Sequence, residues 1–401
     1  MRRPELDYIL GSMLDSQPEV SDLLFTVDKP LQVEALGQLM PVQLEMPIEK
    51  LTPFQTEMTA LNLIGDNQWH LVDLLRRGSC DTAYTLTDKA RFRINIFSQR
   101  GNNSIVLRKL NTVIPTLEWL QFPEIIREIP KEKTGLVLVT GATGSGKSTT
   151  LAAVLNEINH TKPVHIITLE DPVEFVHPHD KATFNQRELG TDFDTFSGGL
   201  RAALRQAPKV ILVGEMRDRE TVKIALSAAE TGHLVLSTLH TIDAGQTINR
   251  ILGMFETEEQ EQIRARLADT LRWVLSQRLI PKVDGGRYAL LEIMGSNLRT
   301  QETVRLGESE GKSFYEIIEA SQPFGWRTFD YSALEAYEQG KITEETALLY
   351  CTKRGPVMRG IDNLKKARGE STHNMSSLRM KSGQDSRAGA APPIPATLKL
   401  K

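Results

Sequence analysis

The chain contains little cysteine and no long hydrophobic segment. Its 401 residues include two cysteines, Cys80 and Cys351, which cannot supply a disulfide framework or a four-cysteine zinc module. No stretch approaches the ~18 consecutive apolar residues of a membrane-spanning helix. The start, "MRRPELDYIL", carries acidic residues where a signal peptide has its apolar part. These absences predict a cytoplasmic protein without zinc, which contacts a membrane only through a partner and does not insert into it directly.

An excess of basic charge is also missing. Lysine and arginine number 48 against 51 aspartate and glutamate residues, and the formal net charge is -3. A protein of this charge has no overall positive field to attract nucleic acid. The composition, 40% hydrophobic and 25% charged, is that of an ordinary globular protein with enough apolar residues for two or three domains. We therefore expect no nucleic acid among its partners.

Residues 1–112 are predicted to form a small α/β domain. Short apolar runs alternate there with turn residues, and Phe92, Ile94 and Ile96 fall on one face of a segment whose other face is polar. This period of two is typical of a strand in a half-buried sheet. Residues 113–134, which are interrupted by prolines, are predicted to be a linker.

From residue 135 onward, apolar runs alternate with helical patterns. "GLVLVT", "HIITLE", "VILVGE" and "HLVLST" indicate buried strands, which predicts a largely parallel sheet covered on both faces over residues 135–294. Within that range, "EQEQIRARLADTLRWVLSQRLI" (residues 259–280) predicts an amphipathic helix and "GRYALLEIM" a returning strand pair. Residues 295–366 are predicted to be helical. Residues 367–401 are rich in Ser, Gly, Ala and Pro and are predicted to be a disordered tail.

The stretch "GATGSGKSTT" at residues 141–150 matches the phosphate-loop pattern of a glycine, four residues, and then Gly-Lys-Ser. Glycines let backbone NH groups surround a β-phosphate, Lys147 neutralises phosphate charge, and Ser148 is a ligand for Mg²⁺. A flexible glycine-rich turn is the alternative, but a strand before the loop and a helix after it favour binding of ATP with Mg²⁺. The predicted nucleotide-binding residues are Gly141, Ala142, Thr143, Gly144, Ser145, Gly146, Lys147, Ser148 and Thr149.

Hydrolysis requires carboxylates as well, and two predicted strands end in them. Glu215 ends "VILVGE", and Glu170, Asp171 and Glu174 lie at the end of "HIITLEDPVE". One carboxylate would orient the attacking water and another would help to hold the metal. Either strand end alone would more often cap the helix that follows. Two such ends beside a phosphate loop favour Glu215 as a catalytic residue, and Glu170 as both catalytic and a metal ligand with Ser148.

Several blocks together resemble the secretion ATPase superfamily, and most of all its PilT branch of type IV pilus retraction motors. These blocks are "GLVLVTGATGSGKSTTLAAVLNEIN", "IITLEDPVEF", "NQRELG", "LRAALRQAPKVILVGEMRDRET" and "AAETGHLVLSTLHT". The resemblance implies a RecA-like P-loop ATPase core, a small N-terminal α/β (PAS-like) domain and C-terminal helices. It makes Glu215 the catalytic glutamate of a Walker B segment. It also implies a histidine box of His233 and His240, with His233 at the nucleotide. His240 follows the predicted strand "HLVLST", a position from which it could sense the γ-phosphate, although either histidine taken alone would more often be a structural hydrogen-bonding residue.

The resemblance further implies a homohexamer in which Arg93 and Arg108 reach a neighbour's catalytic site. Arginine suits the spread charge of a phosphoryl-transfer transition state, although a strand arginine taken alone would more often be solvated. The implied partners are an inner-membrane pilus platform protein and a paralogous retraction ATPase, with the protein peripheral at the inner face of the cytoplasmic membrane. The lack of a four-cysteine module and of a long N-terminal extension favours the retraction branch over the assembly branch.

Two departures from the family pattern leave alternatives open. Ala207 and Lys209 stand where the family commonly has acidic residues, and "GSNLRTQETVRLGESEG" replaces the usual "AIRNLIRE". The leading hypothesis is a hexameric motor ATPase for pilus retraction and twitching motility. The alternatives are an accessory, PilU-like or regulatory ATPase of the pilus machine and, with the least support, a nucleic-acid translocase.

Overall fold

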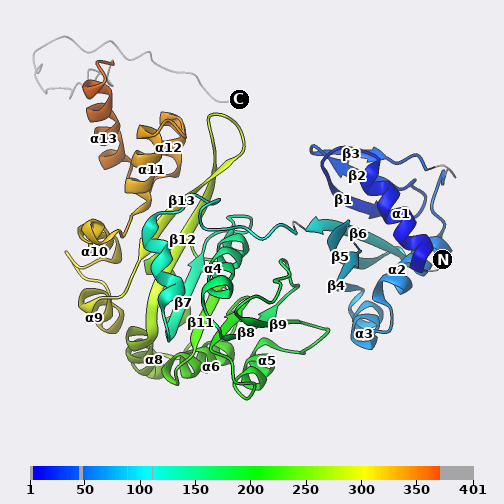
Figure 1. The fold of residues 1–401 in the computed structure, drawn as a ribbon, viewed down its shortest axis with the longest axis horizontal. Coiled ribbons are helices and arrows are strands. Elements are labelled where there is room, and N and C mark those ends of the chain that lie inside the picture. Colours follow the sequence, from blue (N-terminus) through cyan, green and yellow to red (C-terminus); the bar gives the residue numbers. More distant parts are fainter. Residues whose placement is uncertain (1–2, 45–47, 88, 111, 371–401) are drawn as a thin grey trace, which may run out of the picture.

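The computed structural model describes residues 3–44, 48–87, 89–110 and 112–370. Figure 1 shows two sheets, joined by the segment after β6 that contains the short 3-10 helix η1 (Glu124–Lys131). The first sheet has six antiparallel strands in the order β3-β2-β1-β6-β5-β4. Its elements are α1 (Arg3–Asp15), β1 (Val20–Phe25), β2 (Gln32–Ala35), β3 (Gln38–Pro41), α2 (Pro53–Ile64), α3 (Gln68–Arg77), β4 (Ser79–Leu86), β5 (Ala90–Gln99) and β6 (Asn102–Leu110).

The alternation predicted for this sheet is confirmed in β5. Phe92, Ile94 and Ile96 are fully buried, whereas the residues between them are partly or fully exposed. The helices begin where side chains can accept from free backbone NH groups: Thr52 caps α2 in a capping box, and Asn67 caps α3. The result is the small N-terminal α/β domain that the sequence predicts.

The second sheet has seven strands in the order β13-β12-β7-β11-β10-β8-β9, and only β13 is antiparallel to its neighbour. Every residue of β7, β10 and β11 is buried, so helices and loops cover both faces of the sheet, as predicted. This is the RecA-like core. Its elements are β7 (Gly135–Thr140), α4 (Lys147–Thr161), β8 (His165–Glu170), β9 (Thr183–Glu188), α5 (Phe196–Ala203), β10 (Val210–Val213), α6 (Arg219–Glu230), β11 (Leu234–Leu239), α7 (Ala244–Leu252), α8 (Thr257–Thr270), β12 (Leu271–Pro281) and β13 (Arg287–Met294).

The helix predicted over residues 259–280 is wrong in its second half. Helix α8 ends at Thr270, and β12 begins at the next residue. Trp273, Val274 and Leu275 are buried as β12 pairs with β7 on one side and β13 on the other. Pairing with these two strands and burial of both faces outweigh a local pattern that also suits a helix.

The chain after β13 is helical as predicted, with α9 (Leu298–Leu306), α10 (Phe314–Ala320), η2 (Gln322–Phe324), α11 (Phe329–Glu338), α12 (Glu344–Tyr350) and α13 (Arg354–Ala367). Ile280 and Leu290 of the long β12–β13 hairpin share an apolar cluster with α11 and α13 (Figure 1). Residues 371–401 of the predicted tail lie outside the described residues, and the domain boundaries stay a prediction. Among the described residues, no helix combines the length and apolarity needed to cross a membrane.

Candidate nucleotide site

A cleft of about 590 Å³ lies at the carboxyl ends of β7, β8, β10 and β11. Parallel strands deliver their following loops to one edge of the sheet, so segments far apart in sequence meet there. Ten of the predicted site residues line this cleft. They are Arg93, Thr143, Gly144, Gly146, Lys147, Ser148, Thr149, Glu170, Glu215 and His240.

The loop between β7 and α4 has a backbone conformation that favours glycine. Gly141, Gly144 and Gly146 have φ values of +144°, +78° and +90°, in the region that side chains disfavour. A Cβ at Gly141 would lie 2.5 Å from both the carbonyl oxygen of Gln277 and Oγ of Ser145. Ser145 Oγ is buried without a hydrogen-bond partner. The turned loop and the start of α4 at Lys147 fit an anionic group held by backbone NH groups.

Lys147 lies inside this loop. Its Nζ donates hydrogen bonds to the carbonyl oxygens of Gly141 (2.9 Å) and Ala142 (3.0 Å). Burial lowers the pKa of the Lys147 ammonium, and the carboxylates of Glu215 and Glu174 act in the opposite direction. A phosphate in the loop would supply the countercharge that the buried cation has only at a distance.

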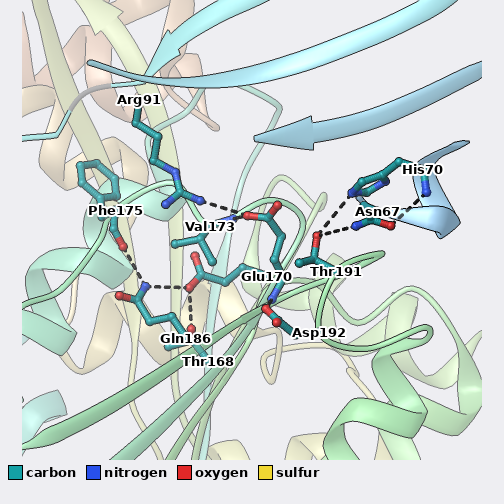
Figure 2. Close-up of polar contacts among 11 residues, drawn as sticks. Asn67, His70, Arg91, Thr168, Glu170, Val173, Phe175, Gln186, Thr191 and Asp192 are labelled. Carbon is teal, nitrogen blue, oxygen red and sulfur yellow. Dashed lines mark hydrogen bonds and ion pairs between the residues drawn. The ribbon is translucent and has the colours of Figure 1, made fainter. Parts of the chain in front are cut away.

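Glu170, at the end of β8, has its carboxylate oxygen Oε1 held by two donors. Thr168 Oγ1 donates to it at 2.6 Å and Gln186 Nε2 at 3.2 Å (Figure 2). Burial raises the pKa of Glu170 to about 7, and these two hydrogen bonds oppose that shift only in part. A cation beside this carboxylate would favour its charged form, which is the chemistry expected of a metal ligand.

Glu215 lies just beyond β10 and contacts two basic side chains. Arg217 Nε is 2.8 Å from Glu215 Oε2, and His240 Nε2 is 3.4 Å from the same oxygen. His240 follows β11, the neighbouring strand, so its contact with Glu215 results from the sheet order. Both basic side chains line the cleft and are substantially exposed.

The remaining predicted site residues lie elsewhere. Gly141, Ala142 and Ser145 belong to the loop but do not line the cleft. Arg108, on β6, pairs with Asp22 on β1 at 2.8 Å and is outside the cleft lining. His233 precedes β11, at the opposite end of this six-residue strand from His240, and its Nδ1 lies 3.0 Å from the carbonyl oxygen of Ala228. The structure therefore separates His233 and Arg108 from the cleft of their own chain.

Sequence reasoning missed several residues of the cleft. Arg217 directly follows the predicted strand end at Glu215, and that position beside a carboxylate was a usable signal. Leu279 and Arg287 line the cleft from β12 and β13, and no local pattern indicates this because their positions depend on the pairing of β12 with β7 and β13. Gln186 acts on Glu170 only through the pairing of β9 with β8.

Comparison with known proteins gives consistent matches. The family model for type II/IV secretion system proteins matches residues 81–322. The chain is 39% identical over 331 residues to the type IV pilus ATPase PilU of Pseudomonas aeruginosa, covering 82% of this chain and 85% of the relative. It is 40% identical over 327 residues to the type IV pilus retraction ATPase PilT of the same organism, covering 82% of this chain and 93% of the relative. A crystal structure of the pilus retraction motor PilT with bound ADP matches with a TM-score of 0.78 and 40% identity, over 88% of this chain and 98% of that one.

Proposed function

The chain belongs to the PilT family of type IV pilus ATPases, within the type II/IV secretion system proteins, and from this membership we propose that it is a motor ATPase that couples ATP hydrolysis to pilus retraction and twitching motility. The observation that carries the proposal is the single cleft that holds Lys147 and Ser148 of the phosphate loop together with Glu170 and Glu215. These side chains are the parts that phosphoryl transfer to water requires.

Each residue then has a task in the reaction. The phosphate loop and Lys147 bind the β- and γ-phosphates, and Glu215 orients the attacking water and accepts its proton. Ser148 and Glu170 would hold Mg²⁺, which would neutralise charge that develops on the phosphate oxygens. His240, in contact with Glu215, is placed to respond to the γ-phosphate. We also propose a role in nucleotide binding for His233, which lies outside the cleft and contacts the carbonyl oxygen of Ala228.

We further propose a homohexamer in which Arg93 and Arg108 complete the catalytic site of a neighbouring subunit. Exposed guanidinium groups on adjacent strands of the N-terminal sheet are consistent with this role. Their arrival from another chain would make hydrolysis depend on assembly. The motor would act on an inner-membrane platform protein from the cytoplasmic face, without inserting into the membrane.

An accessory role is the second candidate. The PilU relative and the PilT relative match this chain at 39% and 40% identity over similar lengths, so both the main motor and an accessory ATPase working with a paralogue fit the comparison. The two roles differ in whether the protein hydrolyses ATP without a paralogue.

The deciding experiment measures ATP turnover of the purified protein and of Glu215→Gln, with oligomeric state from light scattering in the same samples. We expect the wild type to turn over as a hexamer and the variant to bind ATP without turnover, because the amide retains shape but cannot accept the proton. A wild type that binds ATP and does not hydrolyse it would instead support the accessory role.

A further inference from the structure

The block "NQRELG" (residues 185–190) lies on β9 and the turn after it, and the proposed function gives it no task. Strand β9 is the edge strand of the core sheet and pairs with β8 in parallel, with Gln186 opposite Thr168 and Glu188 opposite Glu170. Residues two apart on a strand project from the same face. Gln186 and Glu188 therefore share a face. From it Gln186 contacts Glu170 at the end of β8 (Figure 2), and Glu188 contacts Arg91 of the N-terminal domain.

On the core side, Gln186 is held by three hydrogen bonds. Its Nε2 donates to Glu170 Oε1 (3.2 Å) and to the carbonyl oxygen of Phe175 (2.8 Å), and its Oε1 accepts from the backbone NH of His177 (2.7 Å). The amide is therefore locked in one orientation, with a donor aimed at Glu170. Together with Thr168 Oγ1, the amide fixes the position of that carboxylate oxygen.

On the other side, Glu188 connects the core to the N-terminal sheet. Its Oε2 accepts from Arg91 Nη2 (3.0 Å) and from the backbone NH of Val173 (3.1 Å). The side chains of Arg91 and Glu188 are only 16% and 12% exposed, so water screens this ion pair weakly. Arg91 and Arg93 are two residues apart on β5, and Arg93 lines the nucleotide cleft. The ion pair thus fixes the position of β5 relative to β9.

The turn after β9 adds further contacts with the same domain. Asn67 Nδ2 donates to the carbonyl oxygen of Gly190 (3.1 Å), and His70 Nε2 lies 3.3 Å from Thr191 Oγ1. Gly190 has a φ of +76°, and a Cβ there would lie 3.0 Å from His70 Cε1. The positive φ and the close approach of α3 together favour glycine at this position. Asp192 Oδ2 accepts from the backbone NH of Glu188 (2.8 Å), which closes the turn onto β9.

We propose that β9 and its turn link the placement of the N-terminal domain to the geometry of Glu170, with Gln186 and Glu188 as positioning residues. When the domain is seated, Arg91 holds Glu188, the strand is fixed, and Gln186 directs the Glu170 carboxylate. When the domain shifts, Glu188 loses its cation, and β9, an edge strand with a single neighbour, holds Gln186 less firmly. The link rests on the proposed function, since it affects turnover through the Mg²⁺-holding role of Glu170.

The test compares Arg91→Ala, Gln186→Ala and the double variant in the full-length protein. The readouts are kcat and KM for ATP, and the affinity for a fluorescent ADP with and without Mg²⁺. Because each single variant weakens the positioning of Glu170 by Gln186, we expect about a tenfold lower kcat and a several-fold smaller gain in nucleotide affinity from Mg²⁺. The affinity of each variant for the fluorescent ADP without Mg²⁺ should stay within about twofold of the wild-type value. The double variant should be no worse than the more severe single variant, because both act on one carboxylate.

Two further variants provide a second test of the domain contact and a matched control. Asn67→Asp keeps the side-chain oxygen that caps α3 by accepting from the NH groups of Trp69 and His70, but it loses the donor to the carbonyl oxygen of Gly190. It therefore weakens the domain contact without loss of the cap. Like Arg91→Ala, this variant should show a smaller gain in ADP affinity from Mg²⁺ than the wild type. Arg77→Ala, which removes an exposed ion pair within α3, is the matched control and should match the wild type.

Clear results would overturn the link. One is a double variant whose loss in kcat is the product of the two single losses, because the residues would then act independently. Others are an Arg91→Ala or Asn67→Asp protein that behaves like Arg77→Ala, and a wild type whose nucleotide affinity does not depend on Mg²⁺. If the wild type lacks turnover but its Mg²⁺-dependent affinity falls in the variants as expected, the proposed function fails and the link stands.

Discussion

Among single residues, Glu292 is an ionisable side chain buried in the interior of the protein. It lies on β13 with 3% of its surface exposed, and it accepts a hydrogen bond from the backbone NH of Ala244 at 2.9 Å. Burial raises its pKa from 4.5 to about 7, despite the opposing effects of that hydrogen bond and of Arg278. The folded protein therefore keeps this carboxyl protonated at pH values where the unfolded chain would ionise it.

This shift predicts a pH-dependent stability. Between pH 4.5 and about 7 the folded state binds a proton that the unfolded state has lost, so the free energy of unfolding falls as pH rises through this window. The full loss is about 3 kcal/mol by the usual conversion of pKa shifts. Glu292→Gln keeps an oxygen acceptor for Ala244 and carries no charge. We expect it to melt at a higher temperature than the wild type at pH 8, with little difference near pH 5.

Thermal denaturation at both pH values checks this expectation. Glu57→Gln, an exposed position in the middle of α2, is the control and should show no pH-dependent difference from the wild type. Equal melting temperatures of Glu292→Gln and wild type at pH 8 would contradict the prediction.

At the element scale, the phosphate loop predicts different outcomes for two of its glycines. A Cβ at Gly141 collides at 2.5 Å with the carbonyl oxygen of Gln277 on β12, whereas a Cβ at Gly144 meets no atom within 4 Å. Gly144→Ala should therefore destabilise the loop conformation only by the strain of its positive φ, which is about 1 to 2 kcal/mol. Gly141→Ala should also displace the loop from β12 and weaken ATP binding by at least about tenfold more than Gly144→Ala. Equilibrium titration with a fluorescent nucleotide compares the two, and equal losses would refute the steric argument.

Sequence reasoning worked best where the controlling interactions are local. The phosphate loop, the apolar strands and the helix after the loop follow from neighbouring residues, and all were predicted. Strand β12 was missed because its partners β7 and β13 decide its conformation, and β7 lies more than a hundred residues earlier. The contacts of Glu170 with Gln186 and of Glu215 with His240 were missed for a related reason. They depend on the register of β8 with β9 and on the order of β10 and β11, which local pattern does not determine.

At the scale of the whole molecule, the position of Arg93 poses a question about assembly. Arg93 lines the cleft of its own chain, while our proposal assigns it to the catalytic site of a neighbour. Co-expression of Arg93→Ala and Glu215→Gln subunits separates the two arrangements. If the arginine acts across the boundary, an Arg93→Ala core beside a Glu215→Gln neighbour has a complete site. If it acts within its own chain, no combination of the two variants has one.

We expect each variant alone to be nearly inactive and the mixed ring to recover turnover. Random assembly at equal amounts would place complete sites at about a quarter of the interfaces of a head-to-tail ring. The measurement is steady-state ATP hydrolysis by purified mixed rings. Rings of each variant alone give the baseline. A mixture no more active than the two baselines would refute the intersubunit assignment.

The position of β7 in its sheet also has a consequence for biosynthesis. Strand β7 lies between β11 and β12, so Gly141 of the phosphate loop that follows it packs against Gln277 only after β12 has been made. All strands of the N-terminal sheet precede Asn111, and that domain can fold while the ribosome is still translating the core. At ordinary elongation rates the loop then waits on the order of ten seconds for β12. The nascent chain thus acquires its nucleotide site late, after most of the core has left the ribosome.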